Sequence, residues 1–218
     1  MSNTDETIRE IKNELRLTMN GTASKAIKDS GAGYRLAYGT PIKEIREIAD
    51  KYEKNDITAD KLWSSGVREE MMIATKIWKE ETTDKERIQR IAKEATTLEL
   101  IKEISRNMNT DTVTDETLKE WATSDNENIE ATALEIGAKT IGKRREETKS
   151  KLMAYAIKAA KKGSYLRSKT AAEYIIAYYK EDKGRKEEIK DMMKDMKNGQ
   201  SMTERMTYED VMTEIKYG

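Results

Sequence analysis

The 218-residue sequence contains no cysteine, no histidine and a single proline. Without cysteine the chain forms no disulfide and no thiolate, and nothing in it indicates an oxidising compartment. Because histidine is absent as well, nearly every familiar transition-metal site and every imidazole-based acid, base or triad is excluded. We therefore expect no metal and no cofactor, and any catalysis would depend on carboxylate, lysine, tyrosine or hydroxyl groups.

Long apolar runs are also missing. The N-terminal stretch MSNTDETIREIKNEL is polar and helix-forming, and no segment reaches the length of a signal sequence or a membrane span. The charged fraction of 38% and the mean hydropathy of -0.88 would also suit a disordered chain. The regular spacing of the apolar residues argues against disorder, so we expect a folded, cytoplasmic protein that does not contact a membrane.

The apolar residues recur at the three- and four-residue spacing of amphipathic helices, and alternating strand-like runs are absent. The segments 62–78 and 121–136 each predict a short helix end, a polar turn and a longer helix. Successive helix pairs along the chain are spaced by roughly 30 to 36 residues, just below the length of a HEAT repeat. The pairs are expected to begin near Thr83, Thr114, Thr148 and Gly184.

These patterns predict an all-α fold, a single right-handed HEAT-like α-solenoid of antiparallel helix pairs. The proline, Pro41, follows Thr40, which fits a capping threonine with proline at the first helical position. One domain is expected over 1–218. It would comprise N-terminal helices over 1–36, the repeat array over 37–197, and a C-terminal loop and helix over 198–218.

The net charge is zero, which by itself argues against a dedicated nucleic-acid binder, but the charge is unevenly spread. The segment 139–197 carries 18 lysines and arginines against 9 acidic residues. In a solenoid its inter-helix turns would line up along one edge, where cations could follow a phosphate backbone. The alternative is a solvated lysine-rich surface, since the helix dipole also favours lysine at a helix C-terminus. The cations at these turns and helix ends are Lys143, Arg144, Arg145, Lys158, Lys161, Lys162, Arg167 and Lys169.

Several different short motifs lie within the span from about residue 38 to residue 178. They are the YGTP segment at 38–41, the pairs Ile45-Arg46, Leu62-Trp63 and Arg68-Glu69, and Trp121 with Ser124 and Asn126. Together they resemble the DNA alkylation repair family, HEAT-like repeat glycosylases that remove alkylpurines from DNA, of which this chain would be a divergent member. We expect Trp63 and Trp121 to pack between repeats and Arg68 to form a pair or a cap, so none of the three is catalytic.

The resemblance implies a site in which two tryptophans, an aspartate and an arginine hold the lesion beside DNA. Aromatic faces attract a cationic alkylpurine, and a carboxylate stabilises the positive charge that develops on the sugar. Aligned outward from the motifs, the first tryptophan falls at Leu98, the aspartate at Lys102, the arginine at Ala131 and the second tryptophan at Glu173. A lysine in place of the acid repels both positive charges. The family site is therefore expected to be degenerate, and the catalytic residues are unknown.

The leading hypothesis is a DNA-binding HEAT-like repeat protein of this family that has lost the glycosylase residues. DNA is favoured as partner by the resemblance and by the basic segment, with contacts mainly to the backbone. The candidates for these contacts are Lys102, Lys143, Arg144, Arg145, Arg167 and Lys169.

Two other hypotheses remain open. One is a scaffold that binds another protein, because α-solenoids commonly present a concave surface to a partner and the overall charge is balanced. The other is an active alkylpurine glycosylase that uses substituted residues, such as Glu103, or Glu173 with Tyr174.

Overall fold

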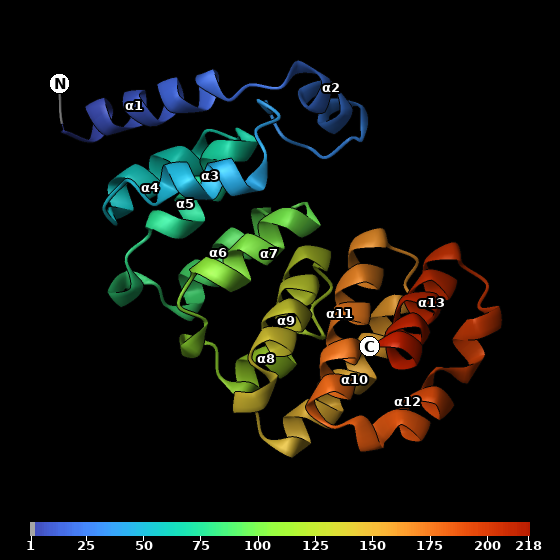
Figure 1. Cartoon of the computed structure of the whole chain (residues 1–218). Helices are drawn as coiled ribbons and strands as arrows, with labels where there is room; N and C mark the ends of the chain where they lie inside the picture. Colours follow the sequence, from blue (N-terminus) through green and yellow to red (C-terminus); the bar gives the residue numbers. More distant parts are fainter. Residues whose placement is uncertain (1–2) are drawn as a thin grey trace. The chain divides into compact units, whose positions relative to one another are not determined.

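The computed structural model describes residues 3–218, which form helices joined by turns and loops (Figure 1). Apart from one isolated parallel bridge between Leu36 and Val67, these residues contain no β-structure, and the all-α prediction is confirmed. None of their helices is both long and apolar enough to cross a membrane. The α-helices are α1 (Asn3–Leu17), α2 (Gly21–Asp29), α3 (Ile42–Ala49), α4 (Asp56–Ser64), α5 (Arg68–Ile77), α6 (Lys85–Glu94), α7 (Leu98–Asn107), α8 (Asp115–Trp121), α9 (Glu127–Lys139), α10 (Glu146–Ala160), α11 (Tyr165–Glu181), α12 (Lys186–Met193) and α13 (Met202–Tyr217).

The predicted starts of the helix pairs agree with α6, α8, α10 and α12 to within two residues. Thr114 is the N-cap of α8 and accepts a hydrogen bond from the backbone N–H of Thr117 at 3.2 Å. The prediction for Thr40 was wrong by one residue, because Pro41 is itself the N-cap of α3. The carbonyl of Thr40 accepts a hydrogen bond from Arg68 rather than from the helix, and its hydroxyl lies 3.0 Å from that of Thr18.

The chain separates into two compact units. The first takes the described residues up to Asp84 and adds Arg106–Asn109, so it contains α1 to α5. The second takes Lys85–Ser105 and Thr110–Gly218, and it contains α6, most of α7, and α8 to α13. The expectation of one domain over 1–218 stays a prediction.

A buried carboxylate organises the first unit. Glu69 is fully buried and accepts hydrogen bonds from the backbone N–H groups of Tyr38 and Gly39 at 2.9 Å and of Thr40 at 3.3 Å. Arg68 donates to the same carboxylate and to the carbonyl of Thr40, both at 2.9 Å. The Arg-Glu motif at the start of α5 therefore satisfies the polar backbone of the segment that leads into α3. This confirms the expected pairing role of Arg68.

The same segment requires a glycine. Gly39 has a φ of +78°, and a Cβ at this position would lie 2.4 Å from the carbonyl oxygen of Asn20 and 2.5 Å from the nitrogen of Ser24. Asn20 caps α2 and donates its own N–H to the carbonyl of Tyr38 at 3.0 Å. Any larger residue would separate α2 from the entry segment.

The two tryptophans of the motifs are packing residues, as expected. Trp63 and Trp121 are both buried at the C-terminal ends of α4 and α8. The ring centroids of Trp63 and Trp78 lie 5.6 Å apart and the ring planes meet at 50°, a tilted arrangement within the range that aromatic pairs prefer. The Trp78 indole N–H donates to Asp60 at 3.1 Å, so this large side chain is buried without an orphaned donor.

Helix α11 forms the centre of the second unit and packs against α9, α10 and α13. Gly137 in α9 allows the close approach of α11, because a Cβ there would lie 3.1 Å from both Leu152 and the ring of Tyr174. Tyr174 is fully buried and donates its hydroxyl to the carbonyl of Lys149 at 2.9 Å. The exposed side chains of α11 are therefore those that a ligand could reach.

Candidate nucleic-acid interface

Two of the residues aligned with the family site form an ion pair. Lys102 of α7 donates through Nζ to Oε1 of Glu173 in α11, at 2.7 Å. The lysine side chain is 33% exposed and the glutamate 46%, so both charges remain accessible to solvent. The structure thus joins the positions that the resemblance assigns to the aspartate and to the second tryptophan, 71 residues apart in sequence.

The other two aligned positions carry small or apolar side chains. Leu98 is the first residue of α7 and is half-buried. Ala131 in α9 is fully buried, and its methyl group offers no charge or hydrogen bond. None of the four positions therefore places an aromatic face or an unneutralised carboxylate at this surface.

The residues named for a substituted glycosylase site are mostly inaccessible. Glu103 is buried in α7. Tyr174 lies in the core, where burial raises the pKa of its hydroxyl above the ordinary value and its proton is held by the carbonyl of Lys149. Only Glu173 of this set is exposed, and it is neutralised by Lys102.

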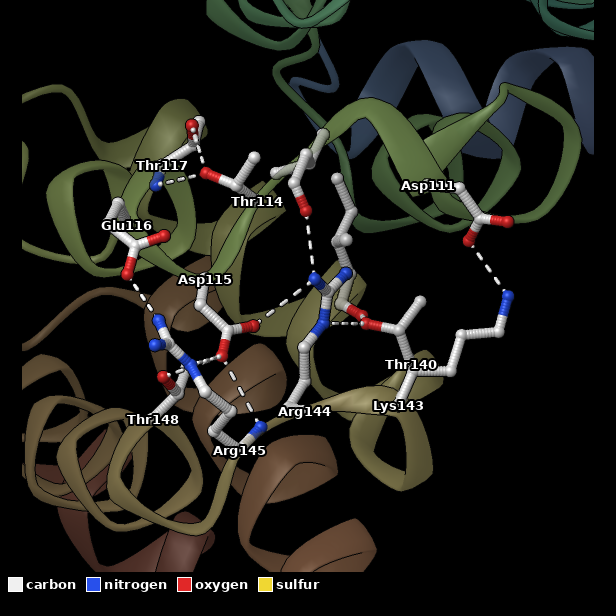
Figure 2. A network of polar contacts seen from close by, with 12 residues as sticks. Asp111, Thr114, Asp115, Glu116, Thr117, Thr140, Lys143, Arg144, Arg145 and Thr148 are labelled. Atoms are coloured by element: carbon white, nitrogen blue, oxygen red, sulfur yellow. Dashed lines mark hydrogen bonds and ion pairs between the residues drawn. The ribbon is translucent and has the colours of Figure 1, made fainter.

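The predicted cluster Lys143 to Arg145 is part of a polar network that ties the start of α10 to α8 (Figure 2). Lys143 pairs with Asp111 at 2.8 Å, at the edge of this network. Arg144 is nearly buried and donates to the carbonyl of Val113 and to the hydroxyl of Thr140. Of the three cations, Lys143 and Arg145 face solvent to a large extent, whereas Arg144 does not.

Asp115 is the centre of that network. Its carboxylate accepts hydrogen bonds from the backbone and side chain of Arg145 and from the Thr148 hydroxyl, and it lies 3.4 Å from Arg144. Burial alone would raise its pKa, but these hydrogen bonds and the charge of Arg144 hold the pKa of Asp115 below its ordinary value. Arg145 also pairs with Glu116. Arg144 and Arg145 thus have structural partners, and a phosphate would have to compete with them.

Arg167 and Lys169, the remaining predicted contacts, are bound to acids of other helices. Arg167 donates through Nε to the buried carboxylate of Glu130 at 2.6 Å, which Lys162 also contacts at 2.7 Å. Lys169 pairs with Asp210 of α13 at 2.6 Å. An open hollow of about 310 Å³ lies between α11 and α13, lined by Lys169, Ala172, Glu173, Ile176, Asp210 and Thr213.

The structure therefore gives carboxylate partners to all six predicted contact residues. Sequence reasoning missed one exposed aromatic residue among these cations, Tyr165 at the start of α11. The signal was present in the sequence, because Tyr165 follows a capping serine in a stretch rich in lysine. Its exposure could not be deduced from the apolar pattern alone.

Comparison with known proteins shows the family to which the chain belongs. The model of the family described as DNA alkylation repair enzyme matches residues 11–203. The chain belongs to this family. A solved structure described as "a new family of proteins related to the HEAT-like repeat DNA glycosylases with affinity for branched DNA structures" matches with a TM-score of 0.70 and 13% identity over 94% of each chain. This likeness shows a HEAT-like fold. No curated protein matches.

Proposed function

We propose that this member of the DNA alkylation repair family binds DNA and does not excise alkylated bases. The ion pair between Lys102 and Glu173 carries the proposal, because it stands where the resemblance places an acid and an aromatic side chain. A lysine at the position of the acid would disfavour both a cationic base and the positive charge that develops on the sugar. Glu173 cannot supply the missing negative charge while it neutralises this lysine.

DNA is the proposed partner on two grounds. The chain belongs to a family of DNA repair proteins, and the segment 139–197 has a twofold excess of cations. The structural relative has affinity for branched DNA, so branched DNA is the first class of ligand to test. Contacts to the backbone would come from cations that exchange a carboxylate for a phosphate, such as Lys102 and Lys169.

The test is a binding isotherm measured at several salt concentrations with a branched DNA and an unbranched duplex of equal length. We expect binding that weakens steeply as salt rises, since released counterions make the affinity of phosphate contacts salt-dependent. Stronger binding of the branched probe would extend the likeness to the structural relative. Absence of binding at low salt, or an affinity independent of salt, would contradict the proposal.

A protein-binding scaffold is the second candidate, and the pairing of all six predicted cations favours it. Surfaces on which charges already neutralise one another do not repel a protein partner. Purification of a stoichiometric protein partner after nuclease treatment would support this candidate. Loss of every partner on nuclease treatment would support DNA binding instead.

A further inference from the structure

The turn between α10 and α11 lies in a stretch of the chain that has cations but no acid. From residue 152 to residue 172 the sequence contains no aspartate and no glutamate. Gly163, with a φ of +76°, follows the end of α10 and lets the chain reverse into α11. The cations of this stretch are Lys158, Lys161, Lys162, Arg167 and Lys169.

Acids from other helices reach only part of this set. Lys162 and Arg167 share the carboxylate of Glu130, and Lys169 meets that of Asp210. Glu127 lies 3.8 Å from Arg167 and accepts a hydrogen bond from the Ser164 hydroxyl. Lys158 and Lys161 are exposed and have no carboxylate within 4 Å among the described residues. A positive charge therefore remains at the turn, at cations that need not give up an ion pair to contact a phosphate.

An exposed aromatic ring follows this turn in the chain and lies beside Lys169. Tyr165 is the first residue of α11 and is 59% exposed, whereas Tyr174, Tyr178 and Tyr179 of the same helix are buried. The ammonium group of Lys169 lies 6.0 Å from the centre of the Tyr165 ring. Because the ring covers little of the core, packing does not account for an aromatic residue here.

We propose that the α10–α11 turn binds an unpaired nucleotide of DNA, with its base stacked on Tyr165 and the adjoining phosphates held by Lys158 and Lys161. Proteins that bind single strands combine such stacking with a positively charged track for the backbone. A base inside a duplex exposes no face for stacking, so the ligand must offer a base outside the duplex stack, as a strand that leaves a duplex at a branch does. This inference rests on the proposed binding of DNA and names the ligand feature and the residues that recognise it.

Fluorescence anisotropy of the full chain tests the stacking with two labelled probes, a duplex and the same duplex with a single-stranded branch. The variants are Tyr165→Ala and Tyr165→Phe, and Tyr217→Ala is the matched control. Tyr217 is also exposed and has Lys216 at 4.8 Å from its ring, but it lies at the end of α13. We expect Tyr165→Ala to weaken binding of the branched probe about tenfold and binding of the duplex less than twofold. Tyr165→Phe and Tyr217→Ala should bind as the unmodified chain does.

The results that would overturn the site can be told apart from the failure of DNA binding as a whole. If Tyr165→Ala and Tyr217→Ala lower the affinity for the branched probe equally, or if Tyr165→Ala lowers the affinity for both probes equally, Tyr165 does not stack on an unpaired base. The proposed binding of DNA is not affected by either result. If the unmodified chain binds neither probe, the proposed function fails and the site fails with it. Lys161→Gln tests the phosphate contact separately: the slope of log affinity against log salt should fall by about one, and an unchanged slope would contradict the contact.

Discussion

The carboxylates of Glu69 and Glu173 are used in opposite ways in the two units of this chain. Glu69 has no exposed surface and accepts three backbone hydrogen bonds and one from Arg68. Glu173 is almost half exposed and holds one lysine of another helix. Glu69 makes its hydrogen bonds to protein groups in place of water. Glu173 remains accessible to water, so another ligand can replace it as the partner of the lysine.

This difference separates charge that fixes the fold from charge that a ligand can displace. Removing one partner of a buried pair leaves an uncompensated charge, which is strongly destabilising. An exposed pair contributes little to stability because water and salt screen it. The buried pair of the fold and the exposed pair of the candidate site can therefore be tested with the same type of substitution.

The largest effect is expected for Glu69→Ala. Arg68 would lose its acid, and three backbone N–H groups would lose their acceptor, so the free energy of unfolding should fall by about 3–5 kcal/mol. Glu173→Ala is the control and should change the free energy of unfolding by less than about 1 kcal/mol. Urea unfolding followed by circular dichroism measures both. Similar losses for the two variants would contradict the distinction.

Asp115 provides an intermediate case with a pH signature. Its pKa is lowered in the folded chain, so its contribution to stability is complete above the unfolded pKa of about 3.9 and is lost as the pH falls through the lower folded value. The stability difference between the unmodified chain and Asp115→Asn should be constant from pH 5 to pH 8 and should shrink below about pH 4. Unfolding measured across this pH range checks it, with the exposed Asp191→Asn as control. A difference that grows in acid would refute the role of Asp115.

The smallest effect is expected for Glu173→Gln, and it concerns DNA rather than stability. The substitution removes the negative charge that faces Lys102, so affinity for DNA at low salt should rise about two- to threefold, with a steeper salt dependence. Glu187→Gln on α12 removes the same charge from an exposed pair with Lys190 and controls for net charge. Identical changes in both variants would show that Lys102 does not contact DNA.

The sequence predicted the helices well because their signals are local. Apolar spacing and capping residues placed the starts of α6, α8, α10 and α12 within two residues. Thr40 was misassigned because a distant residue, Arg68, takes its carbonyl, and no local pattern reveals a partner 28 residues away. The division into two units likewise depends on contacts between distant segments.

The candidate site could be predicted only in part. The resemblance placed Lys102 and Glu173 at positions of the family site. That they form an ion pair depends on how α7 and α11 pack, which the resemblance does not give. The same limit applies to Arg144 and Arg167, whose acidic partners Asp115 and Glu130 come from other helices. A count of charges along the chain cannot show which of them are already neutralised.

The release of bases from methylated DNA tests the central claim most directly. The chain would be incubated with methylated DNA under conditions in which it binds DNA by anisotropy, and free 3-methyladenine and 7-methylguanine would be quantified. The account predicts binding with no release above a protein-free control, because Lys102 and Glu173 neutralise each other where an acid and an aromatic ring would be needed. Release above that control, lost on substitution of Glu173, would contradict it.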